Sequence, residues 1–299
     1  MAGRICTEAK TSKPVLGLFS GLSAAAIWGG MYVVSKVVMQ VIPPFSLIVM
    51  RLALGILTLG IILVVRRGWK VTMRQFWGIF GVGIVGYGIS LGFQFVGTQL
   101  STAANGSLVT SATPAFVLLF AALLLAEKIT RRRLLALGIA TAGVVAVIDP
   151  RNAHLSSSFF WGNLCLVAAA LTWALYSVLI RKVTRETDVL TTTLIAFLGG
   201  LPVCLPLSGW EMATQGFGAI SLGVVAGILF LGIISTALAM YLWNSAFAIL
   251  DAGVASLTFF AQPVVGSLLS VLFLHEHITA LFVIGGVLIG VALIISSKA

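Results

Sequence analysis

Long apolar stretches with almost no charge run through the whole chain, and they constrain its fold more than any other feature. Cutting the sequence at charges, prolines and polar clusters leaves ten such spans, numbered 1 to 10 in chain order: residues 14–38, 44–65, 75–98, 101–126, 132–148, 159–180, 188–207, 218–247, 251–274 and 279–297. An apolar helix of about 20 residues crosses the hydrocarbon core of a bilayer. The 299 residues are 60% hydrophobic and only 9% charged, whereas a soluble domain carries roughly 25% charged residues. The sequence therefore predicts an all-α integral membrane protein with ten transmembrane helices, embedded in the lipid bilayer.

Positive residues are concentrated in alternate connections between the spans. If the N-terminus is cytoplasmic, only Lys36, Arg51 and Arg151 of the 18 lysines and arginines lie outside the inner connections and ends. Cytoplasmic loops carry an excess of positive residues, so we expect a multi-pass protein of the bacterial inner membrane with both termini in the cytoplasm. The net charge of +10 could also indicate a nucleic-acid binder. No nucleic-acid partner is expected, because the charges form short clusters between long apolar spans.

Two stretches of the chain have similar sequences. Residues 107–130 read SLVTSATPAFVLLFAALLLAEKIT, and residues 256–279 read SLTFFAQPVVGSLLSVLFLHEHIT. A second echo joins AAAIWGGMYVVSK around Trp28 to AAALTWALYSVLIRK around Trp173. A repeat of half the chain sets the architecture.

The repeat divides the chain into residues 1–150 and residues 151–299, with five spans in each half. An odd number of spans makes the second half enter the membrane upside down relative to the first. Inverted repeats that meet around a site at the membrane midplane are a recurrent plan of secondary transporters. The sequence therefore predicts two inverted five-helix repeats around a central cavity, with alternating access to it.

A proline lies near the middle of span 4 and another at the corresponding depth of span 9, at Pro114 and Pro263. A proline inside a helix frees the carbonyl four residues earlier, here those of Thr110 and Phe259. In lipid, a freed carbonyl must face protein, water or a ligand. A kink compensated by packing remains open, but the symmetry favours a paired bend that lines one cavity. Both prolines are therefore candidate gating or hinge residues.

Aromatic and amide side chains on the repeated spans are the candidate substrate-binding residues. Rings supply contact area and amides supply orientation, so such a lining would suit a neutral or zwitterionic small molecule with an apolar body. Any single one of them could instead fill the core or lie in an interfacial belt. The candidates are Trp28, Tyr32, Tyr87, Gln94, Asn105, Trp173, Tyr176, Tyr241, Asn244 and Gln262.

All eight acidic residues lie at span ends or in connections, so a carboxylate relay at mid-membrane is not expected. Arg51 lies about two turns inside span 2. There it could anchor the structure, by reaching the interface or by capping neighbouring carbonyls, or it could recognise a substrate carboxylate. The glycines of residues 78–92, together with Gly286 and Gly290, are interpreted as positions of close helix packing.

No residue pattern indicates a metal site, a cofactor or an enzyme. The three cysteines are scattered, and the histidines of His275-Glu276-His277 are two positions apart, so on a helix they diverge and cannot share a metal. A channel would be expected to offer a continuous charged or carbonyl-lined path. The sequence therefore favours a transporter that acts on a small molecule without a cofactor, and it leaves a homodimer open.

The whole chain resembles the EamA family of the drug/metabolite transporter superfamily. The resemblance rests on WGGMYVVSK at residues 28–36, on Arg51, and on the two proline-containing spans that end at Glu127 and Glu276. Within the family it is most similar to the YddG-type exporters of aromatic amino acids. It implies a cavity mainly between spans 1, 3, 4, 6, 8 and 9, peripheral spans 5 and 10, and export of aromatic or large neutral amino acids and related metabolites. The alternative is a neutral-metabolite or drug permease of the same fold.

Overall fold

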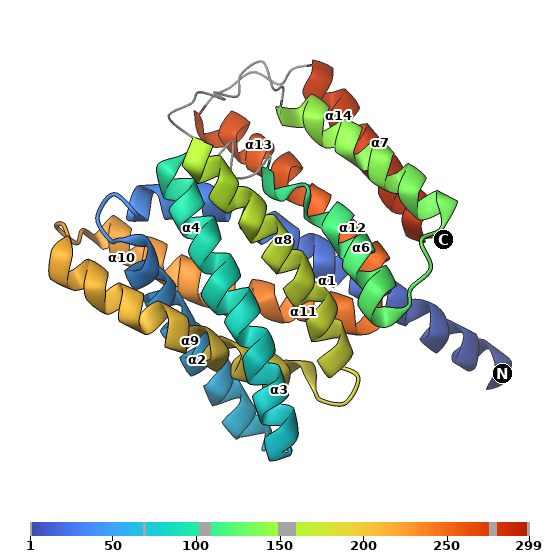
Figure 1. The fold of residues 1–299 in the computed structure, drawn as a ribbon. Helices are drawn as coiled ribbons and strands as arrows, with labels where there is room; N and C mark the ends of the chain where they lie inside the picture. Colours follow the sequence, from blue (N-terminus) through green and yellow to red (C-terminus); the bar gives the residue numbers. More distant parts are fainter. Residues whose placement is uncertain (1, 68–69, 102–108, 149–159, 275–279, 298–299) are drawn as a thin grey trace.

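The structure, a computed structural model, describes residues 2–67, 70–101, 109–148, 160–274 and 280–297, and its regular secondary structure over these ranges is helical throughout (Figure 1). The elements of the first half are α1 (Ala2–Val38), α2 (Pro44–Arg66), α3 (Met73–Gly83), η1 (Ile84–Ser90), α4 (Leu91–Leu100), α6 (Thr113–Leu125) and α7 (Arg131–Ile148). Those of the second half are α8 (Phe160–Val183), α9 (Val189–Thr214), α10 (Leu222–Leu229), η4 (Phe230–Leu238), α11 (Ala239–Ile249), α12 (Ala252–Leu257), η5 (Thr258–Phe260), α13 (Ala261–Leu274) and α14 (Ala280–Ser297).

Every predicted span contains one of these helices, so the predicted fold class is confirmed. Within the described ranges, six helices are long and apolar enough to cross a membrane: Lys13–Val38, Pro44–Arg66, Met73–Leu100, Phe160–Val183, Val189–Thr214 and Leu222–Ile249. Spans 4, 9 and 10 contain shorter apolar helices. In span 4, helix α6 starts at Thr113, two turn residues after the helical residues 109–110, and residues 102–108 lie outside the described ranges.

Side chains from distant parts of the chain bind the free backbone groups at the ends of two helices. The carboxylate of Glu211 accepts hydrogen bonds from the backbone N–H groups of Phe45 and Ser46 at 3.1 and 2.9 Å, at the start of α2. Lys36 donates to the carbonyls of Thr98 and Ser101, both at 2.8 Å, at the end of α4. A negative group at a helix start and a positive group at a helix end both oppose the helix dipole favourably. These contacts join the two halves and fix α1 against span 3.

The helix contacts of one half correspond to those of the other half when each span is replaced by its counterpart in the repeat. Span 1 (α1) packs on span 8 (α11) and span 9 (α13), while its counterpart span 6 (α8) packs on span 3 (η1 and α4) and span 4 (α6). Span 2 (α2) packs on span 7 (α9). Span 5 (α7) packs on span 10 (α14), and Figure 1 shows this pair at one edge of the bundle. This correspondence is what two inverted repeats produce.

Spans 3 and 8 change helix type at corresponding places. Each begins as an α-helix, passes through a π-helical segment, η1 or η4, and continues as an α-helix. A π-helical turn is rare and is often found at functional sites. The two segments therefore direct attention to the side chains around them.

The glycines confirm close packing at some positions and contradict it at others. A Cβ atom on Gly83 would lie 2.1 Å from the carbonyl oxygen of Ala196, and one on Gly199 would lie 2.1 Å from that of Phe80. Spans 3 and 7 therefore touch backbone to backbone. At Gly286 and Gly290 an added Cβ would meet nothing within 4 Å, so the packing interpretation is wrong there.

Candidate functional site

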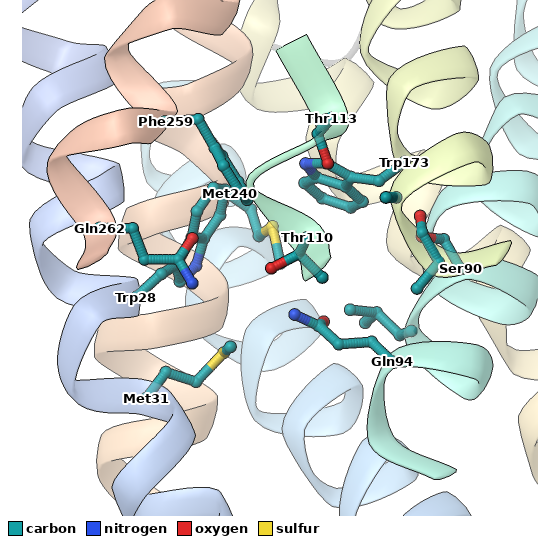
Figure 2. Close-up of a pocket in the computed structure, with 13 residues that line it drawn as sticks. Trp28, Met31, Ser90, Gln94, Thr110, Thr113, Trp173, Met240, Phe259 and Gln262 are labelled. Atoms are coloured by element: carbon teal, nitrogen blue, oxygen red, sulfur yellow. The ribbon is translucent and has the colours of Figure 1, made fainter. Parts of the chain in front are cut away.

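A cavity lies at the centre of the bundle, between spans 1, 3, 4, 6, 8 and 9 (Figure 2). This is the set of spans that the family resemblance implies. Its lining residues are Trp28, Met31, Ser90, Leu91, Gln94, Thr110, Thr113, Ala169, Ala170, Trp173, Met240, Phe259 and Gln262.

The cavity is contracted in this structure. The space open to the centre of a water-sized sphere is about 20 Å³, and a single water molecule needs roughly 10–15 Å³ on that measure. Pockets that hold drug-sized ligands have volumes of roughly 300–1,000 Å³. The bundle must therefore open around this point before a metabolite can be bound.

Aromatic rings form one wall of the cavity. Trp28 lies between Trp173 and Phe259, with ring centroids 5.7 and 6.0 Å away. The indole N–H of Trp28 donates to the carbonyl of Ser235, in the π segment η4, at 3.0 Å. Trp28 is therefore held by its polar end, so its ring is fixed in place for apolar contact.

Three other lining residues present polar atoms that make no hydrogen bond of normal geometry to the residues that the structure describes. These atoms are Nε1 of Trp173, Oγ1 of Thr113, and both Oε1 and Nε2 of Gln262, and all are buried. A buried polar atom left without a hydrogen bond costs about 1–3 kcal/mol. Donors and acceptors that line one cavity without protein partners are suited to bind a polar ligand there.

A short hydrogen-bonded chain closes another side of the cavity. The amide of Gln94 donates to the hydroxyl of Tyr32 at 2.7 Å, and that hydroxyl is 3.0 Å from Oγ1 of Thr110. Spans 1, 3 and 4 are joined by these contacts. Tyr32 thus belongs to the surroundings of the cavity through Gln94 and Thr110, which line it directly.

Tyr87, Tyr176 and Asn244 come together, but they do not line the cavity. The two tyrosine hydroxyls are 2.5 Å apart, and Tyr176 donates to Oδ1 of Asn244 at 2.9 Å. Nδ2 of Asn244 donates to Oγ1 of Thr193 at 3.0 Å. The chain joins spans 3, 6, 7 and 8, and its buried members are satisfied by one another.

Another candidate, Tyr241, is not brought to the cavity either. Tyr241 lines a different hollow, beside Arg66 and Leu190, on the other side of span 8. Its neighbour Met240 faces the cavity instead. Asn105 lies outside the described residues.

Most of the lining residues that the sequence analysis missed lie one helical turn from a residue that it found. Met31 is three positions after Trp28, and Phe259 is three positions before Gln262. Residues three or four apart share a helix face, so the helical spacing was a signal that could have found them. Thr113 lies directly before Pro114 and had no such signal.

The two prolines border the cavity without lining it. Pro114 occupies one of the first two positions of α6, and Pro263 is the third residue of α13, directly after the 3₁₀ turn η5. In each span the regular helix is interrupted before the proline, which then starts the next helical segment. Their role in gating stays a prediction.

Charged side chains from both halves form a network at one end of the bundle. Arg133 is paired with Asp251 at 2.6 Å and with Glu127 at 3.4 Å, and Arg181 is paired with the same two carboxylates at 2.9 and 3.1 Å. Glu127 also accepts from the backbone N–H of Ala252 at the start of α12. The four charges lie at span ends that the charge distribution assigns to the cytoplasm. They tie span 4, span 5 and span 6 to span 9 on that side.

Comparison with known proteins agrees with this architecture. A crystal structure superposes with a TM-score of 0.76 over 93% of this chain and 95% of that chain, at 22% sequence identity. The chain is 25% identical to a probable amino-acid metabolite efflux pump of Salmonella typhimurium, over 93% of both proteins. It is 27% identical to the aromatic amino acid exporter YddG of Ancylobacter novellus, over 84% of this chain and 86% of that protein. An uncharacterized transporter of Archaeoglobus fulgidus is 26% identical, over 91% of this chain and 95% of that protein.

The profile of one family matches the chain twice. It covers residues 15–148 and residues 160–298, one match on each side of the boundary expected near residue 150. The two matched ranges span nearly the whole bundle, including all six spans around the cavity. The protein is a multi-pass membrane protein and belongs to the EamA-like transporter family.

Proposed function

We propose that the protein is an inner-membrane secondary transporter that exports aromatic or large neutral amino acids and related small metabolites by alternating access. The observation that carries this proposal is the pairing of ring surface from Trp28, Trp173 and Phe259 with unpartnered polar atoms of Trp173 and Gln262 in one cavity. Rings would contact an apolar side chain, and the amide would bind a polar head group. Two relatives whose names describe amino-acid export support the same substrate class.

The contracted cavity fits a carrier that changes shape around its substrate. A central site that opens to one side at a time, between two inverted halves, is the arrangement expected of alternating access. Among the described residues that line the cavity there is no carboxylate. We therefore expect that substrate movement does not require protonation of a buried acid.

Transport into proteoliposomes tests the proposal directly. Purified protein should exchange radiolabelled phenylalanine and leucine faster than alanine, with and without a pH gradient. Trp173→Ala should weaken phenylalanine transport roughly tenfold, because an indole surface is worth about 1–2 kcal/mol to a ring that it touches, and it should affect alanine much less.

A matched control lies on the same helix. Trp161 is also in α8, but it is 68% exposed on the outer surface, so Trp161→Ala should transport both amino acids like the wild type. An equal loss for phenylalanine and alanine in Trp173→Ala would contradict the assigned role. If transport stops when the pH gradient is removed and no other ion gradient restores it, the expectation that transport needs no protonation of a buried acid is contradicted.

A further inference from the structure

Arg51 is a buried cation close to the cavity. Its side chain is in α2 and has no exposed surface. Nε donates to Oγ1 of Thr236 at 2.9 Å, and Nη2 is 3.5 Å from Oγ of Ser235. Its Cζ lies 4.8 Å from the centroid of the Phe95 ring. Because the side chain is fully buried inside the bundle, it does not extend outward to an interface, as one of the expected roles would require.

The charge of Arg51 is not neutralised by a carboxylate in the part of the chain that the structure describes. By contrast, Arg133 and Arg181 are paired with Glu127 and Asp251 at one end of the bundle. The contacts of Arg51 are all neutral, and its Nη1 atom has no hydrogen-bond partner. Arginine stays protonated in proteins, and a charge within a membrane span is costly enough that it marks a functional site by default.

The flexible side chain of Met31 links Arg51 to the cavity. Sδ of Met31 is 3.6 Å from Nη2 of Arg51, and Met31 also lines the cavity. Figure 2 shows Met31 and Gln94 on the side of the cavity opposite Phe259 and Thr113. Methionine is unbranched and adapts its shape easily, so Met31 can move aside when the cavity widens.

From this arrangement we propose that Arg51 is the residue that selects for a carboxylate on the substrate. When the cavity opens, Met31 withdraws from Nη2, and Nη2 together with the unpartnered Nη1 binds the carboxylate, in the forked geometry that arginine and carboxylates favour. The apolar part of the substrate then rests against Trp28 and Trp173. The inference rests on the proposed function and narrows its substrates to carboxylate-bearing molecules, as opposed to amines or uncharged compounds.

A pair of ligands that differ only in the carboxylate tests this role. Wild-type protein in detergent should bind phenylalanine roughly 10- to 100-fold more tightly than phenylalaninamide, which is the range expected for hydrogen bonds to a charged group. In Arg51→Gln the two affinities should become equal, chiefly through weaker binding of phenylalanine. Arg51→Lys should keep part of the preference, since it keeps the charge but loses the fork. A preference that persists in Arg51→Gln overturns the proposal.

A second experiment leaves Arg51 in place, so it does not depend on folding of the charge variants. Met31→Cys is labelled with an anionic thiol reagent, with Thr113→Cys as the control on the opposite side of the cavity. The concentrations of phenylalanine and phenylalaninamide are first adjusted so that both ligands protect Thr113→Cys from labelling equally. Phenylalanine should then protect Met31→Cys several-fold better than the amide does, and equal protection overturns the proposal.

The outcome for the proposed function is separate. If the wild type binds and transports no amino acid, the proposed function fails, and the same labelling with benzoate and benzamide still tests whether Arg51 selects carboxylates. If amino acids are transported but the amide competes as well as the acid, the proposed function stands and the role of Arg51 fails.

Discussion

The buried hydroxyl of Tyr176 is expected to be important for stability rather than for substrate binding. Tyr176→Phe removes the donor to Asn244 and the acceptor for Tyr87 together. Each buried polar atom that loses its partner costs about 1–3 kcal/mol, so the melting temperature in detergent should fall by several degrees. Tyr87→Phe is the matched variant at the end of the chain. Tyr87→Phe should lower the melting temperature less, because Tyr176 keeps its hydrogen bond to Asn244. Equal decreases in the two variants would contradict the arrangement in which Tyr176 lies between Tyr87 and Asn244.

Four of the ten candidate substrate-binding residues line the cavity, and they are side chains that are unusual for a membrane span. Trp28, Trp173, Gln94 and Gln262 line the cavity as expected, because amides and indoles in an apolar helix need a reason to be there. Thr113 could not be predicted in this way, since a threonine can satisfy itself against its own helix. To predict which residue faces the cavity, one must know how each helix is rotated about its axis as well as its composition.

Tyr241 illustrates why the rotation of a helix about its axis cannot be read from the sequence. It follows the π segment η4, and a π turn holds more residues than an α turn, so it changes the face on which later residues appear. Counting with the α-helical period does not distinguish Tyr241 from Met240, although only Met240 faces the cavity. The π segment itself has no clear signature in the sequence.

At the scale of the helices, the two prolines start helical segments rather than interrupting them. Their missing N–H groups cost little at such positions, so Pro114→Ala and Pro263→Ala should keep the wild-type melting temperature within a few degrees. If the interruptions before the prolines act as hinges, alanine lets each span become continuous and turnover should fall severalfold. Melting temperature and flux are measured on the same preparation, and wild-type flux in both variants would remove the prolines from the mechanism.

The contact between spans 3 and 7 depends on the absence of side chains. Gly83→Ala places a methyl group where the carbonyl oxygen of Ala196 lies 2.1 Å away, so the helices must separate, at a cost of about 1–3 kcal/mol. Gly81 is on the same helix, and an added Cβ there meets nothing within 4 Å. Gly81→Ala should therefore leave the melting temperature unchanged or raise it, since alanine favours helix by about 1 kcal/mol over glycine. Equal effects of the two variants would show that spans 3 and 7 are not in backbone contact.

For the molecule as a whole, the ion-pair network is expected to hold the cytoplasmic side closed. Glu127→Gln removes two pairs and leaves Arg133 and Arg181 with Asp251 alone. With about 1 kcal/mol lost for each partly exposed pair, the closed form should become roughly tenfold less favoured. Thr113→Cys should then be labelled faster from the cytoplasmic side of inside-out vesicles. Glu186 is exposed, so Glu186→Gln serves as the control. If Thr113→Cys is labelled at the same rate with Glu127→Gln and with Glu186→Gln, the ion-pair network does not hold that side closed.

The orientation of the whole bundle is tested by two single cysteines. Gly209 is exposed near the end of α9, and Arg132 is exposed at the start of α7. The distribution of positive residues places the first outside and the second inside. In intact cells an impermeant reagent should label Gly209→Cys but not Arg132→Cys, and the reverse pattern would invert the proposed direction of export.

The architecture was predictable from sequence because it depends on patterns that repeat many times. Ten apolar spans and two similar halves leave few alternatives, and an odd number of spans in each half requires inversion. The cross-half contacts were not predictable, because pairs such as Glu211 with Ser46 join residues far apart in the sequence through individual atoms.

The contracted cavity has a consequence for the cell's energy supply. With about 20 Å³ of free space, the centre of the bundle holds about one water molecule, and one molecule cannot form a continuous file across the bilayer. Protons move through membranes along such files of water, so the contracted cavity of the described bundle does not supply one. A cell can then keep many copies in its membrane without a standing leak of its proton-motive force through this cavity.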